Sequence, residues 1–297
     1  MLISLLLAGF ALAHAPALNA AQSAQLIRTR SLCARGVHCL LAQETTEGPY
    51  YISHPLIRSN ITGDRTGIPF TLDITLLDVG SCAPVAGAFV DIWHADAEGE
   101  YSGWASMAAP VETWGTPVEP SRWLRGVQVS DAGGRVHFAT VWPGWYAGRA
   151  THIHLRVHNG NVSTDHGVLL GGGTVSHTGQ LFFADELVRN VSRTYEPYAT
   201  RRRSLKPTLN GDDGIFVHEG GAEQIVTVRQ LDGRFVGSVT VGIDPLADHE
   251  PWHPHPETHL KVAVIGIAVC MVLAYIVRKV MLRRVEVRRE RAGYGTI

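Results

Sequence analysis

Two histidines and a tyrosine lie close together in the segment PGWYAGRATHIHLRVH, residues 143–158. Side chains alternate between the two faces of a β-strand, so His152 and His154 share one face. Two imidazoles at this spacing can bind one metal ion. Tyr146 precedes them on a turn that a Pro-Gly pair opens, and the turn directs its phenol back toward the same point. The segment therefore predicts a metal site on one face of a strand.

A second tyrosine occurs in a comparable setting earlier in the chain. In AFVDIWHADAEGEYSGW, residues 88–104, an alternating apolar strand ends in an acidic, glycine-containing turn just before Tyr101. Together with WLRG, PGWYAGRATHIH and HTGQLFF in that order, this segment resembles the intradiol ring-cleavage dioxygenases, most closely their secreted members. The resemblance extends over residues 46–241. It implies a non-haem Fe(III) ion with four ligands, Tyr101, Tyr146, His152 and His154.

The resemblance also implies a reaction. The expected substrates are a catechol-type aromatic diol and O2, and the ring is expected to open between its two hydroxylated carbons to give a muconate-type product. Tyr146 is expected to be released and to take a proton from the substrate. Arg149 and Gln180 are expected to line the substrate pocket. Arg149 stands three residues before His152, where it can stabilise negative charge on substrate oxygens.

The residue types also suit Fe(III) on physical grounds. Phenolate is a hard anionic donor, and hard oxygen donors favour a small, highly charged cation. A free tyrosine titrates near pH ~10, so both phenols would stay protonated at neutral pH without such a cation. Two phenolates and one hydroxide neutralise Fe(III). A catechol dianion can replace the hydroxide and one phenolate without a build-up of charge.

Two other functions fit part of the pattern. His94 and Asp96 form an H-x-D pair at a strand end, and with His152 they would make a two-histidine, one-carboxylate site for an Fe(II) oxygenase. That site leaves both tyrosines unexplained. The other alternative is a β-sandwich that keeps the shape of the site but serves as a membrane-tethered, non-catalytic binding module.

Apolar alternation predicts an all-β fold for the body of the chain. We expect strands at residues 70–76, 88–93, 136–142, 151–158, 225–229 and 235–241, and a short helix at 186–195. Short strands separated by turn residues favour a β-sandwich or a barrel, and the resemblance favours the two-sheet sandwich. About 200 residues are enough for a single domain with its own core. We place this domain at residues 46–243.

The start of the chain predicts secretion. Residues 1–20 combine a short apolar run with small residues, which is typical of a signal peptide, and residues 21–45 form a leader. A secreted protein is expected to form disulfides. The resemblance implies a bridge between Cys39 and Cys82, and pairing of Cys33 with either of them stays open. The glycosylation motif Asn-X-Ser/Thr occurs at Asn60, Asn161 and Asn190.

The end of the chain predicts a membrane anchor. Residues 244–259 are rich in proline and histidine and are expected to form an extended linker. The apolar segment 260–277 is expected to span the membrane as a C-terminal helix, and the basic tail 278–297 to stay in the cytoplasm. The protein is therefore expected to be a single-pass membrane protein of the secretory pathway or cell surface, with the sandwich outside or in a lumen.

Charge is distributed unevenly along the chain. The formal net charge is −1, but the tail is basic and the sandwich is correspondingly acidic. This distribution argues against nucleic-acid binding by the sandwich. The sequence does not indicate an oligomeric state.

Overall fold

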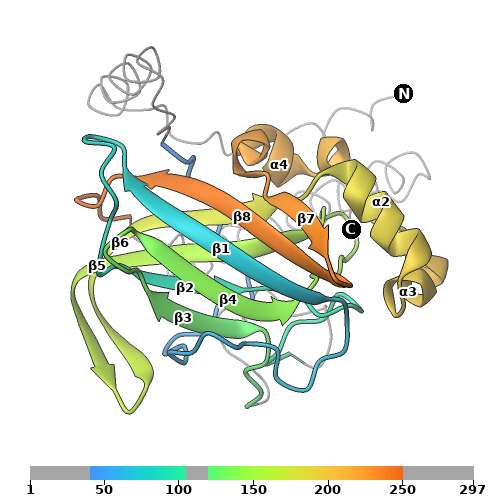
Figure 1. Ribbon diagram of the computed structural model, residues 1–297, viewed down its shortest axis with the longest axis horizontal. Helices are drawn as coiled ribbons and strands as arrows, with labels where there is room; N and C mark the ends of the chain where they lie inside the picture. Colours follow the sequence, from blue (N-terminus) through green and yellow to red (C-terminus); the bar gives the residue numbers. More distant parts are fainter. Residues whose placement is uncertain (1–40, 105–119, 250–297) are drawn as a thin grey trace, which may run out of the picture. The chain divides into compact units, whose positions relative to one another are not determined.

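Alternating apolar residues form two β-sheets in the computed structural model of the protein, which describes residues 41–104 and 120–249. The first sheet has the strand order β4-β1-β8-β7, and the second has the order β3-β2-β5-β6. The two sheets lie face to face as a sandwich (Figure 1). The all-β, two-sheet sandwich predicted from the sequence is therefore confirmed.

The first sheet is built around β1 (Pro69–Asp78), which the sequence predicted as a half-buried strand. It pairs antiparallel with β4 (Arg135–Val141) and parallel with β8 (Arg234–Ile243). The strand β7 (Thr227–Leu231) pairs with the other side of β8.

The second sheet contains the histidine strand β5 (His152–Asp165). It pairs antiparallel with β2 (Phe89–Trp93) on one side and with β6 (Val168–Phe182) on the other. The strand β3 (Arg125–Val129) pairs with β2. Neither β3 nor β6 was among the expected strands, because β3 is short and a run of three glycines after Leu170 interrupts the alternation of β6.

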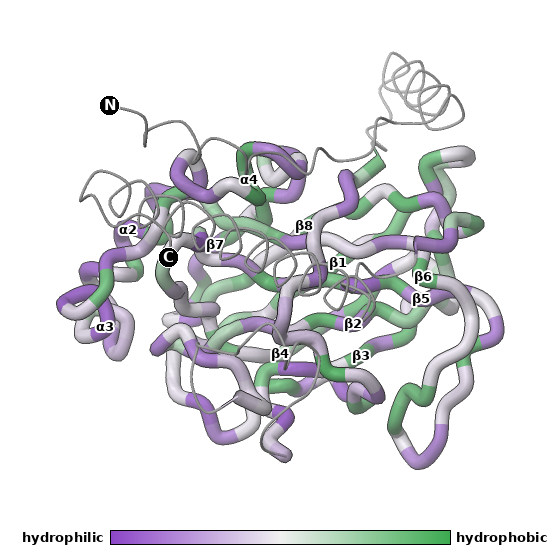
Figure 2. Tube along the Cα trace, turned by 180° about the vertical axis from the view of Figure 1, so that it is seen from behind, coloured by the Kyte–Doolittle hydropathy of each residue, from purple (hydrophilic) through white to green (hydrophobic). Residues whose placement is uncertain are grey.

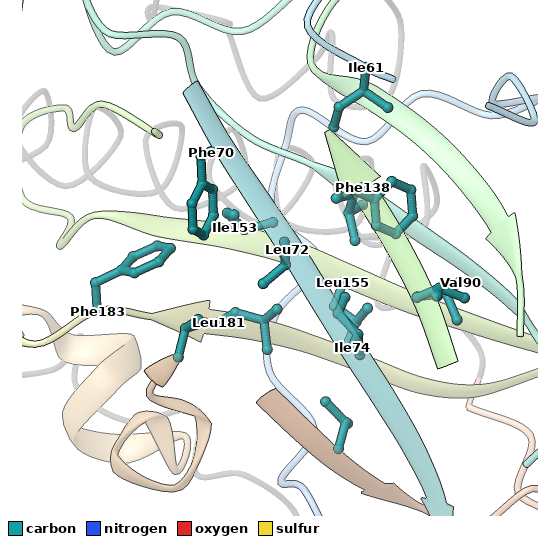
Figure 3. Close-up of a cluster of buried hydrophobic side chains, with 14 of the residues drawn as sticks. Ile61, Phe70, Leu72, Ile74, Val90, Phe138, Ile153, Leu155, Leu181 and Phe183 are labelled. Atoms are coloured by element: carbon teal, nitrogen blue, oxygen red, sulfur yellow. The ribbon is translucent and has the colours of Figure 1, made fainter. Parts of the chain in front are cut away.

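A hydrophobic core fills the space between the sheets. Phe70, Leu72 and Ile74 of β1 point toward the second sheet, where Ile153 and Leu155 of β5 meet them (Figure 3). All five side chains are at most 1% exposed. Fully burying one such side chain stabilises the fold by about 1.5–3 kcal/mol. The core face predicted for residues 151–158 is thus confirmed.

The opposite face of the second sheet is also buried, although its side chains are polar. It carries four residues of β5 that are all at most 6% exposed, namely His152, His154, Arg156 and His158. Residues 41–57 cover this face. The amide of Thr45 donates to the carbonyl of Thr178 at 2.9 Å, and Glu47 accepts from Arg156 at 2.7 Å. The site predicted from the sequence therefore lies in a second, polar interior.

The packed body extends past the boundaries expected from composition. The amide of Ala42 donates to the carbonyl of Gly242 at 2.8 Å, within the expected leader. At the other end, the amide of His249 donates to the carbonyl of Val175 at 2.7 Å, within the expected linker. A composition rich in proline and histidine argues against a regular strand, but it does not prevent a segment from docking by single hydrogen bonds.

Short helices follow β6. They are α2 (Asp185–Thr194), α3 (Tyr198–Ser204) and α4 (Gly214–His218), with 3-10 turns at Asn210–Asp212 and Gly221–Gln224. The helix predicted at residues 186–195 is confirmed as α2, which buries Val188 and Val191. Most of α3 is hydrophilic (Figure 2).

The strands β5 and β6 continue beyond the sandwich as a two-stranded arm, residues 159–174 (Figure 1). Most of the arm is exposed. The pairing register shifts between Val157 and His158 and twice more within the arm. All of these shifts lie on the arm side of His154.

Several predictions concern residues that the structure does not describe. Among residues 41–104 and 120–249, no helix is long and apolar enough to cross a membrane. The expected signal peptide, membrane span and tail lie outside these ranges. Cys82 is disulfide-bonded, but Cys33 and Cys39 also lie outside them, so the pairing with Cys39 stays a prediction. The three glycosylation motifs are described, and Asn60, Asn161 and Asn190 are all exposed.

Candidate active site

Residues from four neighbouring strands form a row across the polar face of the second sheet. Trp93 of β2 lies opposite Arg125 of β3 on one side and opposite His154 of β5 on the other. His154 in turn lies opposite Gln180 of β6. Residues directly opposite in neighbouring strands share a face. The register therefore brings the predicted ligand His154 next to the predicted pocket residue Gln180.

Both predicted tyrosines reach this face. The hydroxyl oxygen of Tyr101 lies 3.0 Å from Nε2 of His154 and 3.3 Å from Nε2 of His152. The hydroxyl oxygen of Tyr146 lies 3.4 Å from Nε2 of His152, and the two Nε2 atoms are 3.1 Å apart. The four side chains predicted to bind a metal are thus brought together. We call these four residues the Tyr–His cluster.

The separations within the Tyr–His cluster suit a metal ion. Ligand bonds of about 2.0–2.1 Å, at angles of about 90–110°, put neighbouring donor atoms about 2.8–3.4 Å apart. Nδ1 of His152 lies 2.6 Å from the carbonyl of Ala150 and must carry the proton to donate to it. Its Nε2 therefore presents a lone pair to the other members of the cluster, as a metal ligand does.

Burial controls the protonation of the cluster. It lowers the pKa of His152 and His154 well below the ordinary histidine value, and the positive charge of Arg149 lowers both further. Both imidazoles are therefore neutral, which is the form that binds a metal. Burial also raises the pKa of Tyr101 and Tyr146. Both phenols consequently keep their protons unless a cation displaces them.

Arg149 is held beside the cluster by several partners. Its Nε donates to the carboxylate of Asp213 at 3.0 Å, and its Nη2 donates to Oε1 of Gln180. Its Nη1 lies 3.3 Å from the hydroxyl oxygen of Tyr146. Gln180 is fixed in turn because its amide donates to the carbonyl of Thr46 at 2.8 Å. The two predicted pocket residues therefore contact each other at the edge of the Tyr–His cluster.

Asp213 was not anticipated from the sequence. Its side chain is fully buried, and besides Arg149 it accepts hydrogen bonds from the amides of Ala150 at 2.8 Å and Ile215 at 2.9 Å. It lies 64 residues from Arg149 along the chain, so only the tertiary fold brings the two together. The one local signal is that an aspartate precedes α4 as its N-cap.

Residues 41–57, which cover the polar face, also cover the Tyr–His cluster. The ring of Tyr50 stacks on Tyr101, with centroids 4.6 Å apart and planes 16° from parallel. Gly48 passes beside His154 at a φ of +77°, and a Cβ there would lie 3.2 Å from Cε1 of the imidazole. Tyr146 is only partly buried, whereas the other three members are at most 3% exposed. The cluster is therefore most accessible at Tyr146.

The alternative Fe(II) site is contradicted by the geometry. Nδ1 of His94 lies 2.8 Å from a backbone carbonyl and Nε2 lies 2.8 Å from the hydroxyl of Thr140, so both nitrogens are already engaged. Asp96 instead accepts from two backbone amides of its own turn. Within the part of the chain that the structure describes, no group of three His, Cys, Asp or Glu side chains could hold a metal. A site made of His94, Asp96 and His152 does not form.

Similarity to known proteins decides the family. A family model described as a dioxygenase matches residues 46–190, which include the Tyr–His cluster, Arg149 and Gln180. The solved intradiol ring-cleavage dioxygenase of Tetranychus urticae is 34% identical, with a TM-score of 0.63, and the match covers 72% of this chain and 98% of that one. The chain belongs to the intradiol ring-cleavage dioxygenase family. A second solved dioxygenase, also 34% identical, has a TM-score of 0.62 and is matched over 98% of its length and 71% of this chain.

Membership of the intradiol ring-cleavage dioxygenases settles the class of protein. The chain is an oxygenase enzyme, so the non-catalytic binding module considered from the sequence is wrong. The resemblance identified from Tyr101, Tyr146 and the H-x-H strand is confirmed at the level of the family. Asp213 lies outside residues 46–190, and it enters the site only through the fold.

Proposed function

We propose that the Tyr–His cluster binds one non-haem Fe(III) ion, and that the enzyme uses O2 to cleave a catechol-type ring between its two hydroxylated carbons. The observation that carries the proposal is the convergence of two phenols and two imidazoles at separations of 3.0–3.4 Å. Phenolate oxygens are hard donors that favour a trivalent cation over a soft one. Neutral imidazoles complete a ligand set for which no carboxylate is needed.

Bound Fe(III) would lower the pKa of the phenols and make a catechol dianion reactive toward O2. Both oxygen atoms of O2 are then incorporated, and the ring carbons that carried the hydroxyls become the two carboxyl carbons of a muconate-type product. A catechol dianion carries the same charge as one hydroxide and one phenolate together. Substrate binding therefore leaves the net charge of this buried site unchanged.

Tyr146 is the phenol suited to exchange with the substrate. Its side chain is partly exposed, whereas Tyr101 is 1% exposed and stacked against Tyr50. As a phenolate, Tyr146 takes a proton from a catechol hydroxyl when it is displaced. The guanidinium of Arg149, 3.3 Å from the Tyr146 oxygen, stabilises the negative charge before this transfer.

Arg149 acts on the substrate after Tyr146 has been displaced. Its positive charge stabilises the negative charge that develops on the substrate oxygens. Asp213 and Gln180 hold the guanidinium from its other sides, so the charge does not need to reorient during the reaction. A fixed donor in a water-poor site contributes more than the same donor in water.

A visible absorption spectrum of the purified protein loaded with Fe(III), recorded without O2 and with or without catechol, tests the proposal. Tyrosinate bound to Fe(III) gives a strong visible charge-transfer band. We expect a red-brown protein whose band shifts to longer wavelength with catechol, and a muconate-type product when O2 is admitted. A protein that stays colourless and iron-free by elemental analysis after Fe(III) addition would refute the site.

Matched variants test the individual ligands. His154→Ala should lose iron and colour. His158→Ala is its control, because His158 lies on the same face of β5 and is 6% exposed, but it is not a member of the cluster. Tyr146→Phe should keep iron, lose part of the visible band and turn over very slowly. Full iron occupancy in His154→Ala, or normal turnover in Tyr146→Phe, would contradict the assignment.

We also propose that the sandwich lies outside the cell or in a lumen, tethered by residues 260–277 after removal of residues 1–20. The exposure of Asn60, Asn161 and Asn190 supports modification in a secretory pathway. Glycosidase treatment of the protein from secretory cells should increase its electrophoretic mobility. Protease added to sealed membranes should digest either the sandwich or the tail. If protease added to intact cells removes the sandwich, the sandwich lies at the cell surface.

A further inference from the structure

Arg125 is a buried cation that the proposed reaction does not use. It belongs to the WLRG motif and is 5% exposed. Among the described residues, no carboxylate forms an ion pair with it. The charge of the buried Asp91 acts on Arg125 without direct contact. Burying a charge without a direct ion pair is costly unless hydrogen bonds compensate for the lost water. The contacts of Arg125 therefore indicate its role in the protein.

Among the described residues, the hydrogen bonds of this guanidinium go to Tyr50 and Ser102, which both adjoin Tyr101. Its Nε donates to the hydroxyl of Ser102 at 2.7 Å, and its Nη2 donates to the carbonyl of Ser102 at 2.8 Å. Its Nη1 donates to the carbonyl of Tyr50 at 2.6 Å. Ser102 follows Tyr101 in the chain, and the ring of Tyr50 stacks on the ring of Tyr101. Arg125 thus connects the backbone of Ser102 to Tyr50, the residue whose ring stacks on Tyr101.

The charge of Arg125 also faces aromatic rings of this loop. Its guanidinium carbon lies 5.9 Å from the ring centroid of Tyr101 and 5.3 Å from that of Trp104. A cation within about 6 Å of an aromatic ring is attracted by it. The hydroxyl of Ser102 in addition donates to the carbonyl of Trp123 at 2.7 Å. The WLRG segment therefore holds the Tyr101 loop both through its side chain and through its backbone.

Tyr101 needs such support more than the histidines of the cluster do. His152 and His154 stand on β5, where paired strands on both sides fix the backbone. Tyr101 lies in the loop beyond the end of β2, outside any strand. A ligand on a loop keeps its geometry only if neighbouring groups hold it.

We propose that Arg125 is a positioning residue that holds Tyr101 in the geometry of the Tyr–His cluster. The inference rests on the proposed Fe(III) site. Arg125 occupies the same cross-strand row as His154, on the far side of Trp93. One face of the sheet therefore provides both a residue of the cluster and the side chain that places Tyr101 against it.

Three variants test this role. Arg125→Met removes the hydrogen bonds of the guanidinium but keeps a long side chain that is apolar. Ser102→Ala removes the hydroxyl that accepts from Nε of Arg125. Arg156→Met is the matched control, because Arg156 is also a buried arginine on this face of the sheet, 6% exposed, but it pairs with Glu47. Fe(III) affinity is measured by competition with a chelator, together with the visible band and the melting temperature.

We expect Arg125→Met to lower Fe(III) affinity by about 10–100-fold, the usual effect of losing a residue that orients a metal ligand. Its visible band should weaken, because Tyr101 no longer reaches the ion reliably. Ser102→Ala should show the same changes to a smaller degree, and it decides the matter if Arg125→Met does not fold. Arg156→Met should lower the melting temperature while leaving affinity and band unchanged. Normal affinity in both Arg125→Met and Ser102→Ala, or an equal loss in Arg156→Met, would overturn the proposal.

Amide hydrogen exchange of the iron-free protein separates this inference from the proposed function. Exchange at residues 101–104 should accelerate in Arg125→Met and stay unchanged in Arg156→Met. If the wild-type protein binds no Fe(III), the proposed function fails, whereas the exchange rates still decide whether Arg125 holds the loop. Unchanged exchange in Arg125→Met would show that it does not.

Discussion

Trp93 lies flat against the imidazole of His154, with ring centroids 4.8 Å apart and planes 5° from parallel. The two residues are cross-strand partners on β2 and β5, so the register of the sheet sets the stack. Among the described residues, Nδ1 of His154 has no hydrogen-bond partner, whereas Nδ1 of His152 is anchored at the carbonyl of Ala150. On the Nδ1 side, packing rather than hydrogen bonding therefore holds the ring of His154.

Trp93→Phe should weaken Fe(III) binding about 10-fold, because a smaller ring leaves His154 freer to rotate. Trp142→Phe is a matched control, since Trp142 is fully buried between Phe70 and Phe183 in the core between the sheets. Both variants should lower stability by about 0.5–3 kcal/mol. Chelator competition and thermal melting separate the two effects. Equal affinity losses in the two variants would contradict a specific role for the stack.

Asp213→Asn should lower kcat by about 10–100-fold while the protein keeps its iron. Asparagine has nearly the same shape, but it has no negative charge to hold the guanidinium of Arg149. The neighbouring Asp212 is exposed, so Asp212→Asn is the control and should behave as wild type. Oxygen uptake gives the rate, and elemental analysis gives the iron content. A loss of iron in Asp213→Asn would instead indicate that Asp213 supports the Tyr–His cluster itself.

Glu47 should make the stability of the protein depend on pH. Burial raises the pKa of Glu47 from 4.5 to about 7, and the nearby Arg156 only partly opposes this. The folded state therefore holds the proton more tightly than the unfolded state. The stability that this group contributes is fully present below pH 4.5 and is lost as the pH rises through about 7.

Glu47→Gln should remove this pH-dependent loss of stability, which amounts to roughly 3 kcal/mol. Urea unfolding at several pH values should show a flatter dependence of unfolding free energy on pH for Glu47→Gln than for the wild type. Glu223→Gln changes an exposed glutamate and should leave the dependence as it is. Parallel curves for wild type and Glu47→Gln would show that Glu47 titrates normally.

Cys39→Ser and Cys82→Ser should each lower stability by about 2–4 kcal/mol under oxidising conditions, and the double variant should lose no more than either single one. The iron-dependent colour should remain in all three. Melting temperatures with and without reductant provide the measurement. A neutral Cys39→Ser beside a destabilised Cys82→Ser would assign the bridge to another cysteine.

The histidine strand could be predicted because its alternation is local. Ile153 and Leu155 face the core, and His152 and His154 face the site, as side-chain parity requires. The parity does not indicate what covers the polar face, and residues 41–57 do so through contacts distant in sequence. The position of Gln180 beside His154 depends on the pairing of β6 with β5, which local alternation does not indicate.

Arg125 and Asp213 could not be predicted as parts of the site for a related reason. Each stands in a short segment with little periodicity, β3 in one case and the cap of α4 in the other. Their partners, Ser102 and Arg149, lie 23 and 64 residues away along the chain. A local sequence pattern identifies residues that can bind a metal or react. The residues that hold them in place can be identified only from the tertiary fold.

The register shifts in the pairing of β5 with β6 all lie on the arm side of His154. A β-bulge absorbs an extra residue locally. An insertion or deletion within residues 159–174 therefore does not require His154 to move relative to Trp93 and Gln180. It would instead disturb the backbone hydrogen bonds of the arm to Pro55 and Ile57. One hairpin therefore combines a half with an interrupted register and a half in which a shift of a single residue would turn the histidines into the core.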